Sequence, residues 1–167
     1  MLTDFDSSDE FFIRTAIEAA IMARSLAEIP IGACIVSARG EILAVAGNRT
    51  RIDCDPTAHA EILALRAAAR AVGNYRLTDA VVYSTIEPCA MCAGALIQAR
   101  VKKLVYGAPD ERFGAVKSKF EICDNSSLNH RIEIISGVLE AECRNLMQSF
   151  FQEKRRKTIR NNQCRDS

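Results

Sequence analysis

The sequence predicts an α/β fold in which helices cover both faces of a sheet. Apolar residues recur at helical spacing near the N-terminus, and several later short apolar runs are bounded by turn residues. Strands and helices largely alternate after an initial hairpin, an order typical of a three-layer α/β/α arrangement. With 167 residues, the chain has the length of one domain.

The first predicted helix spans residues 7–28. Ser7 opens a capping-box pattern, and apolar residues then recur every three or four positions until the segment ahead of Pro30. Two apolar runs follow, at residues 31–36 and 41–46. The Gly-containing turn between these runs predicts a β-hairpin.

A second long helix is predicted over residues 58–72, with Thr57 near its cap and Gly73 just past its end. The apolar run at residues 81–86 predicts a strand. Pro88 follows this strand at a position suited to the first turn of another helix.

Two further strands are expected at residues 104–106 and 131–135, before a final helix that begins near Leu139. This helix grades into a basic tail. We therefore divide the chain into a domain of residues 1–153 and a C-terminal tail of residues 154–167.

The tail carries six basic residues and one acidic residue, whereas the whole chain has a net charge of only +1. A solvated helix end accounts for such a bias, because cations suit a helix C-terminus. A contact with nucleic acid is the alternative explanation.

The composition is ordinary for a soluble globular protein, with 49% apolar and 26% charged residues. The N-terminus is acidic and lacks the pattern of a secretory signal. No apolar run approaches the ~20 residues of a membrane span. We therefore expect a cytoplasmic protein without membrane contact, in which the seven cysteines are metal ligands or core residues rather than disulfides.

Two short motifs carry the candidate chemistry. Cys89 and Cys92 lie three residues apart at a predicted helix start, so both sulfurs share one face and the helix dipole favours the thiolate. His59 begins another helix and supplies a third ligand. Three protein ligands leave one tetrahedral zinc position open for water, as in catalytic zinc sites. Glu61 is then placed to carry protons without being a ligand.

Each motif alone is weak evidence. Cys-x-x-Cys also occurs in redox sites, and a structural zinc site would need a fourth ligand, for which Cys54, Cys123 and His130 are available. The combination of both motifs, with Pro88 directly before Cys89, is the signature of zinc-dependent deaminases.

At this level of detail the sequence resembles the bacterial tRNA-specific adenosine deaminases, within the zinc-dependent cytidine and deoxycytidylate deaminase superfamily. The resemblance extends from about residue 11 to residue 156. It is carried by blocks at residues 55–62, 74–77 and 85–95, with support from residues 129–131 and 150–151.

The resemblance implies a cytidine-deaminase-like fold with a five-stranded mixed sheet, one Zn²⁺ per subunit, and a homodimer that requires no other protein partner. The implied reaction is hydrolysis of adenosine to inosine at the wobble position (34) of a tRNA anticodon, usually in an arginine tRNA. The implied partner is the anticodon stem-loop, whose target base is flipped into the zinc pocket.

The resemblance also implies which residues contact the substrate. Asn48 would bind the purine edge through its side chain, and the backbone of Ala60 would add a second contact. Without the resemblance, a loop-capping Asn and a helix-packing Ala describe these residues equally well. Three residues would form apolar pocket walls or, alternatively, part of the core: Ile29, Pro30 and Ile86.

Two more regions are implied to contact RNA. Asp110 and the loop through Gly114 resemble the segment that lies against the bound strand, and Phe150 or Phe151 would stack on or beside a flipped nucleotide. Burial on an amphipathic helix explains one of the two phenylalanines equally well. Residues 111–113, Glu-Arg-Phe, are bulkier than the family pattern, and residues 117–127 also diverge from it.

Two other functions compete with this interpretation. A deaminase of a free base or nucleotide, such as guanine or deoxycytidylate, would share the zinc signature but would not need the basic tail. A non-catalytic RNA-binding protein would keep zinc for structure alone, and Glu61 argues against it. The basic tail favours the RNA enzyme, because RNA is a polyanion and basic residues bind its phosphates.

Overall fold

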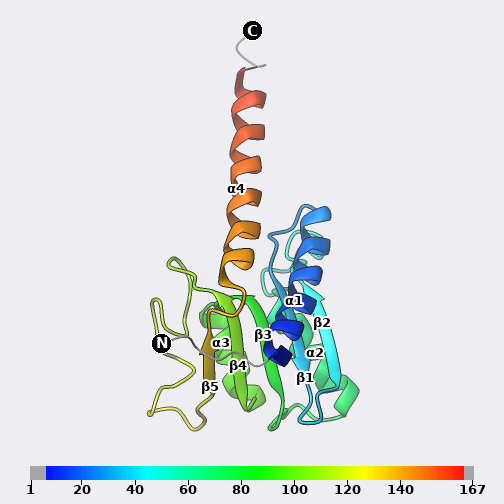
Figure 1. The fold of residues 1–167 in the computed structure, drawn as a ribbon, viewed down its shortest axis with the longest axis vertical. Helices are drawn as coiled ribbons and strands as arrows, with labels where there is room; N and C mark the ends of the chain where they lie inside the picture. Colours follow the sequence, from blue (N-terminus) through cyan, green and yellow to red (C-terminus); the bar gives the residue numbers. More distant parts are fainter. Residues whose placement is uncertain (1–6, 164–167) are drawn as a thin grey trace.

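The structure is a computed structural model that describes residues 7–163. The remaining residues of the predicted domain and tail, 1–6 and 164–167, lie outside this range. Figure 1 shows the elements in chain order: α1 (Ser7–Ser25), β1 (Gly32–Val36), β2 (Ile42–Gly47), α2 (Ala60–Val72), β3 (Val81–Ile86), α3 (Ala90–Ala99), β4 (Lys103–Ala108), β5 (Glu133–Ser136) and α4 (Glu140–Gln163).

The strands form one five-stranded sheet in the order β2-β1-β3-β4-β5. β1 is antiparallel to both β2 and β3, whereas β3, β4 and β5 are parallel to one another. Parallel neighbours need a crossover connection, and α3 supplies it between β3 and β4. The predicted mixed sheet is confirmed.

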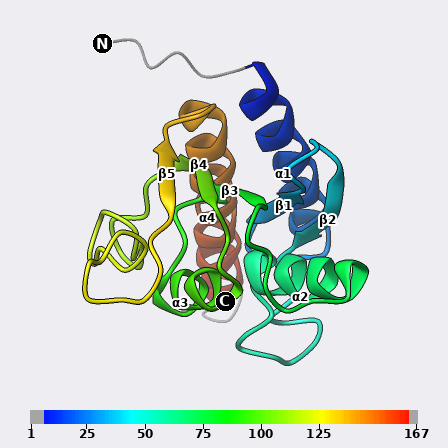
Figure 2. The same cartoon turned by 90° about the horizontal axis from the view of Figure 1, so that it is seen from below.

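Helices cover both faces of the sheet. Figure 2 shows α1 and α4 on one side and α2 and α3 on the other. One apolar cluster joins strand residues such as Val82 and Leu104 to α2 and α3. A second cluster joins Cys34 and Val105 to α1 and α4. The predicted three-layer arrangement is therefore confirmed.

α1 lies directly on the backbone of the hairpin. A Cβ atom added to Gly32 would lie 1.9 Å from the carbonyl oxygen of Ala16, and one added to Gly47 would lie 2.6 Å from that of Ala19. Glycine at both positions, with small alanines opposite, allows this close approach. The contact fixes the height of α1 above β1 and β2.

α1 ends at Ser25, so the predicted end near residue 28 is wrong. Ala27 adopts the left-handed conformation, with φ of 63°, and the N–H of Glu28 bonds back to Ala23 at 3.0 Å. This bonding pattern closes a helix at its C-terminus. It also turns Glu28 into the interior, where its side chain is fully buried.

The starts of α2 and α3 also differ from the prediction. His59, rather than Thr57, is the N-cap of α2, and Cys89 is the N-cap of α3. Pro88 therefore precedes the cap instead of occupying the first turn. Its carbonyl accepts a hydrogen bond from the N–H of Ala115 at 2.8 Å.

α4 runs unbroken past residue 153 to Gln163 and projects beyond the sheet, as Figure 1 shows. The boundary that the sequence suggests between domain and tail therefore falls inside one helix. Within residues 7–163, no helix combines the length and the apolar character that a membrane span requires.

We predict that Gly32→Ala lowers the free energy of unfolding by about 1–3 kcal/mol, because the new methyl group overlaps the backbone of α1. Gly94→Ala is the control. Gly94 lies inside α3 with open space around it, so alanine there should raise the free energy of unfolding by about 0.5–1 kcal/mol. Urea unfolding measures both values, and equal stabilities of the two variants would contradict the packing described.

Candidate metal centre

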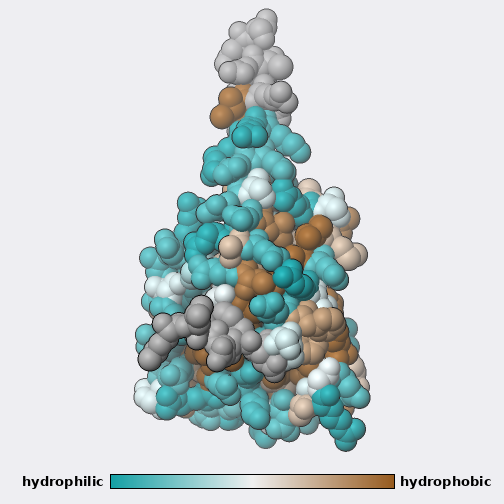
Figure 3. Space-filling view, viewed as in Figure 1, coloured by the Kyte–Doolittle hydropathy of each residue, from teal (hydrophilic) through white to brown (hydrophobic). Residues whose placement is uncertain are grey.

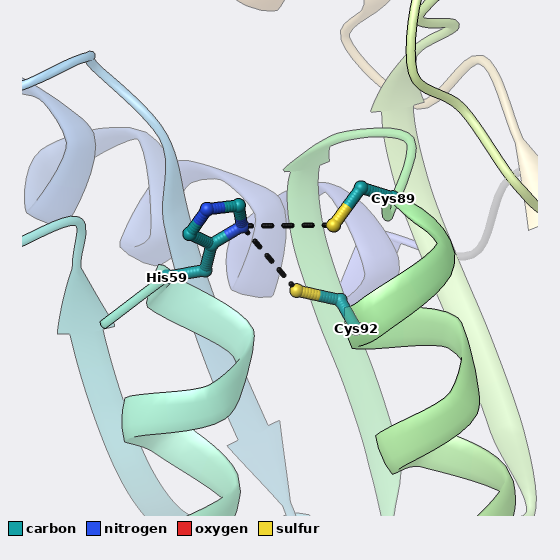
Figure 4. Close-up of side chains that lie close together, drawn as sticks. All are labelled: His59, Cys89 and Cys92. Atoms are coloured by element: carbon teal, nitrogen blue, oxygen red, sulfur yellow. Dashed lines mark hydrogen bonds between the residues drawn. The ribbon is translucent and has the colours of Figure 1, made fainter. Parts of the chain in front are cut away.

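The three predicted zinc ligands come from the first residues of two neighbouring helices. His59 is the N-cap of α2, Cys89 is the N-cap of α3, and Cys92 lies in the first turn of α3. Both cap residues have extended backbone, with no capping bond from their own side chains. Their side chains are therefore available to point toward one another, as Figure 4 shows.

The spacing of the donor atoms fits a zinc ion. The Sγ atoms of Cys89 and Cys92 each lie 3.6 Å from Nδ1 of His59. A tetrahedral zinc with ordinary Zn–S and Zn–N bonds separates nitrogen from sulfur by about 3.6 Å. Among residues 7–163, these three form the one cluster of three or more His, Cys, Asp and Glu side chains with metal-binding spacing.

The residues considered as a fourth ligand lie elsewhere. Cys54 is exposed, and its Sγ lies 3.7 Å from the carbonyl of Arg51. Burial in the cluster beneath α2 and α3 raises the pKa of Cys123 to about 12, which disfavours the thiolate that a metal needs. His130 bonds the carbonyl of Val101 at 2.8 Å. The described residues thus hold a three-ligand cluster.

The pKa values of the two thiols move in opposite directions. A hydrogen bond with Cys92 lowers the pKa of Cys89 to about 4, against the opposing effect of burial, and His59 adds to the lowering. The same hydrogen bond, together with burial, raises the pKa of Cys92. The protein groups alone therefore favour one thiolate, not two. Zinc binds the deprotonated sulfur and would stabilise both, so the donor set fits this metal.

Glu61 lies beside the cluster and is almost completely buried, with 3% of its surface exposed. Its Oε2 is 3.5 Å from Sγ of Cys92, and its Oε1 is 3.4 Å from the hydroxyl of Ser84. Burial is the main reason why the pKa of the Glu61 carboxyl is raised. A carboxylate whose pKa is raised accepts a proton more readily than an ordinary carboxylate.

Asn48 and Ala60 are brought together by a hydrogen bond to each other. The N–H of Ala60 donates to Oδ1 of Asn48 at 2.8 Å, so the Asn side chain caps α2 from outside the helix. Of the Ala60 backbone, which the resemblance implies as a substrate contact, the N–H is therefore bonded within the protein. Only 3% of the Asn48 surface is exposed, and its bonded oxygen fixes the orientation of its amide group.

Two buried carboxylates that the sequence analysis missed hold the loops around the cluster. Glu28 accepts hydrogen bonds from the N–H groups of Arg51 and Ile52 and from the hydroxyl of Thr50. Glu87 does the same for the loop after β4. Its donors are the N–H groups of four residues, Asp110, Val116, Lys117 and Ser118, and the Ser118 hydroxyl.

Each missed residue leaves only a faint signal in the sequence. Glu28 is a charged residue beside the apolar Ile-Pro-Ile segment, and Glu87 directly precedes the Pro-Cys pair. Ser84 is a polar residue within an apolar strand. Each pattern marks a polar group at a buried position, but none identifies the partner of that group.

The other predicted substrate residues are spread over several environments. Pro30 is buried and Ile29 half-buried, whereas Ile86 lies in the apolar cluster that α1 and α4 cover. Asp110 is half-buried, and its Oδ1 accepts the N–H groups of Arg112 and Phe113. Asp110 and Ile86 are thus held within the fold by these contacts.

Phe150 and Phe151 form an edge-to-face pair on α4, with ring centroids 5.4 Å apart. Phe150 is buried, with 6% of its surface exposed, and the Lys154 ammonium lies 5.3 Å from its ring centre. Phe151 is 41% exposed. Of the two rings, Phe151 is the one open to another molecule.

Comparison with known families agrees with this geometry. The model of the cytidine and deoxycytidylate deaminase zinc-binding region matches residues 6–108, which include all three ligands and Glu61. The chain belongs to this deaminase family. Within the family, it is 46% identical to a tRNA-specific adenosine deaminase of Haemophilus influenzae, over 88% of this chain and 85% of the relative.

Solved structures of deaminases share the fold. One, from a study of A-to-I editing by tRNA:A34 deaminases at the wobble position of transfer RNA, superposes with a TM-score of 0.78 and 41% identity, covering 81% of this chain and 98% of the other. A guanine deaminase of Bacillus subtilis superposes with a TM-score of 0.58 and 38% identity, covering 63% and 66% of the two chains.

We predict that His59→Ala and Cys89→Ser each remove most of the zinc from this deaminase, because two remaining protein ligands bind the ion weakly. Cys54→Ala is the matched control and should retain the zinc of the wild type, since its thiol is exposed and outside the cluster. Metal analysis of the purified variants measures the difference. Zinc loss in Cys54→Ala would instead indicate a four-ligand structural site.

A second prediction concerns acid stability. Burial raises the pKa of Glu87, but hydrogen bonds from Ser118, Lys117 and Asp110 outweigh this effect and keep the pKa below its usual value. The folded pKa thus lies below the unfolded value of about 4.3. The stabilisation by Glu87 is present above that value and is lost as the pH falls through the folded pKa.

Glu87→Gln should therefore lower the free energy of unfolding at pH 7, and the difference from wild type should shrink as the pH falls below about 4. Urea unfolding at a series of pH values measures this difference. Glu121→Gln, at an exposed position nearby, is the control and should match wild type throughout. A difference for Glu87→Gln that stays constant with pH would show that the carboxylate charge is not what holds the loop.

Proposed function

We propose that this enzyme hydrolyses adenosine to inosine at wobble position 34 of a tRNA anticodon, in particular that of an arginine tRNA. The observation that carries the proposal is the buried Glu61 carboxyl beside the His59, Cys89 and Cys92 cluster, with its Oε2 3.5 Å from a ligand sulfur. One zinc ion per subunit, held by these three residues, would lower the pKa of a water molecule, so that hydroxide would be available as the nucleophile near neutral pH.

Glu61 moves the protons of the reaction. Its carboxylate accepts one proton from the attacking water and passes it to a ring nitrogen of the purine. It then accepts the remaining proton of the new hydroxyl group and passes it to the departing amine, so that a C–O bond replaces the C–N bond and ammonia leaves. Burial and the raised pKa suit the carboxyl to both steps. Ser84, 3.4 Å away, limits the orientations that the carboxylate can adopt.

The purine is held by Asn48 in this proposal. The Ala60 N–H fixes Oδ1 of Asn48, which leaves the Nδ2 donor to meet an acceptor on the purine edge. Ala60 thus acts through Asn48. Ile29 and Pro30 line the apolar side of the same pocket, and the loop at Asp110 lies along the bound strand.

The RNA substrate is favoured over a free base by the relatives named as tRNA-specific adenosine deaminases and by the surface of α4. Figure 3 shows a mainly hydrophilic surface on the projecting part of this helix, where Arg155, Arg156 and Lys157 are exposed. These cations, in the tail of residues 154–167, suit the phosphates of an anticodon stem-loop. Phe151 is the exposed ring available for stacking on a nucleotide.

The proposed unit is a cytoplasmic homodimer that needs no further protein. Its deaminase domain is residues 1–153, continuous with the basic tail through α4. Deamination of free guanine is the second candidate, favoured by the likeness to the guanine deaminase of Bacillus subtilis. A free base would gain nothing from the cations on α4.

The test is inosine formation at the wobble position of an adenosine-bearing arginine tRNA transcript by zinc-loaded protein. We predict inosine with wild type and a loss of roughly 10²–10⁴-fold in kcat for Glu61→Gln, with zinc content unchanged. Glu18→Gln, at an exposed carboxylate on α1, is the control and should retain full activity.

Ammonia release from guanine without inosine in the transcript would replace the RNA substrate by the free base. Unchanged turnover in Glu61→Gln would contradict the role of this residue in either reaction.

A further inference from the structure

The loop between β4 and β5 carries an exposed aromatic ring close to the metal ligands. Phe113 is 70% exposed and directly precedes Gly114, which forms an isolated antiparallel bridge with Cys89. The Cα atoms of bridged residues lie about 5 Å apart and those of consecutive residues about 3.8 Å apart. The Cα atom of Phe113 is therefore within about 9 Å of the Cα atom of Cys89.

The backbone that carries this ring is held firmly in place. Glu87 binds the loop on both sides of Phe113 through the N–H groups of Asp110 and Val116. Its carboxyl also packs on Gly114 so closely that an added Cβ would lie 2.4 Å from it. Asp110 caps the N–H of Phe113 itself. A ring on an ordered backbone loses little conformational entropy on binding.

The surroundings of the ring indicate what it binds. Most other exposed residues of this part of the loop are charged, namely Glu111, Arg112, Lys117, Lys119 and Glu121, and Phe120 is a second exposed ring. Protein interfaces are depleted of charged residues at their centres, so this surface does not suit a protein partner. A flat exposed ring with a cation next to it in the chain suits an unpaired nucleotide, whose base stacks on the ring while its phosphate contacts the cation.

We propose that Phe113 and Arg112 form a stacking site for the unpaired base next to the target adenosine in the RNA substrate. This inference rests on the proposed function, because it assumes a single-stranded target region in RNA. The short Cα distance to Cys89 brings Phe113 within reach of a base that flanks an adenosine bound at the cluster.

The first experiment compares the affinity of zinc-loaded variants for an anticodon hairpin, using fluorescence anisotropy. Phe113→Ala should weaken binding roughly 5- to 100-fold, the range for loss of one base–aromatic stack, whereas Phe113→Trp should bind like wild type.

Tyr75→Ala is the matched control for this comparison. Tyr75 is 69% exposed and has the Arg76 guanidinium 5.4 Å from its ring centre, so it is a similar aromatic and arginine pair. It follows the C-terminus of α2, about 20 Å along that helix from His59. The affinity of Tyr75→Ala for the hairpin should equal that of wild type.

The second experiment uses hairpins that lack the base directly 5′ or directly 3′ of the adenosine. For wild type, one of the two abasic hairpins should bind roughly 5- to 100-fold more weakly than the intact hairpin. Phe113→Ala should bind that abasic hairpin and the intact one equally, because the stack is already lost. Penalties of equal size in wild type and Phe113→Ala would overturn the proposal.

Two further outcomes would also overturn it. One is equal hairpin affinity in Phe113→Ala and wild type, and the other is a change of oligomeric state in Phe113→Ala with RNA affinity intact, which would make Phe113 part of a protein interface. Inosine formation by wild type is scored separately. If wild type forms no inosine in any hairpin, the proposed function is contradicted. If inosine forms but wild type and Phe113→Ala bind the hairpin equally well, only the stacking site is contradicted.

Discussion

The site depends on the meeting of two helix N-termini on one face of the sheet. His59 precedes the two cysteines by 30 and 33 positions, yet its Nδ1 must lie 3.6 Å from the Sγ atom of each. No covalent link holds them there. The sheet supports α2 and α3 side by side, and each helix begins at a ligand. Because both helices direct the positive ends of their dipoles at the cluster, thiolate charge is favoured where zinc would bind.

The same constraint explains the buried carboxylates. Helix starts and the loops that precede them expose N–H groups that need acceptors. Asn48 accepts a hydrogen bond from the N–H of Ala60. Glu28 accepts hydrogen bonds from N–H groups of the loop after β2, and Glu87 accepts them from N–H groups of the loop after β4. The rim of the site is therefore organised before a substrate arrives. An ordered rim favours binding, since less conformational freedom is lost.

The sequence predicts much of this architecture because its local signals are strong. Cys89 and Cys92 lie three positions apart at the start of one helix, so their spacing predicts chelation once it is combined with the His59 motif. Gly73 correctly marks the end of α2. Other features depend on contacts distant in sequence. The acceptors Glu28 and Glu87 bind backbone N–H groups, which are the same in every residue type and leave no pattern. Likewise, α1 ends early through a left-handed alanine, a conformation that alanine rarely adopts and composition does not reveal.

The central claim is that zinc is held by three protein ligands with one position open. X-ray absorption at the zinc edge of the purified protein tests it most directly. The account predicts two sulfur atoms and two light atoms around the metal, one of the light atoms belonging to a single imidazole. Three or four sulfur atoms, or two imidazoles, would mean that the protein fills every position. The site would then be structural, and the catalytic account would fail.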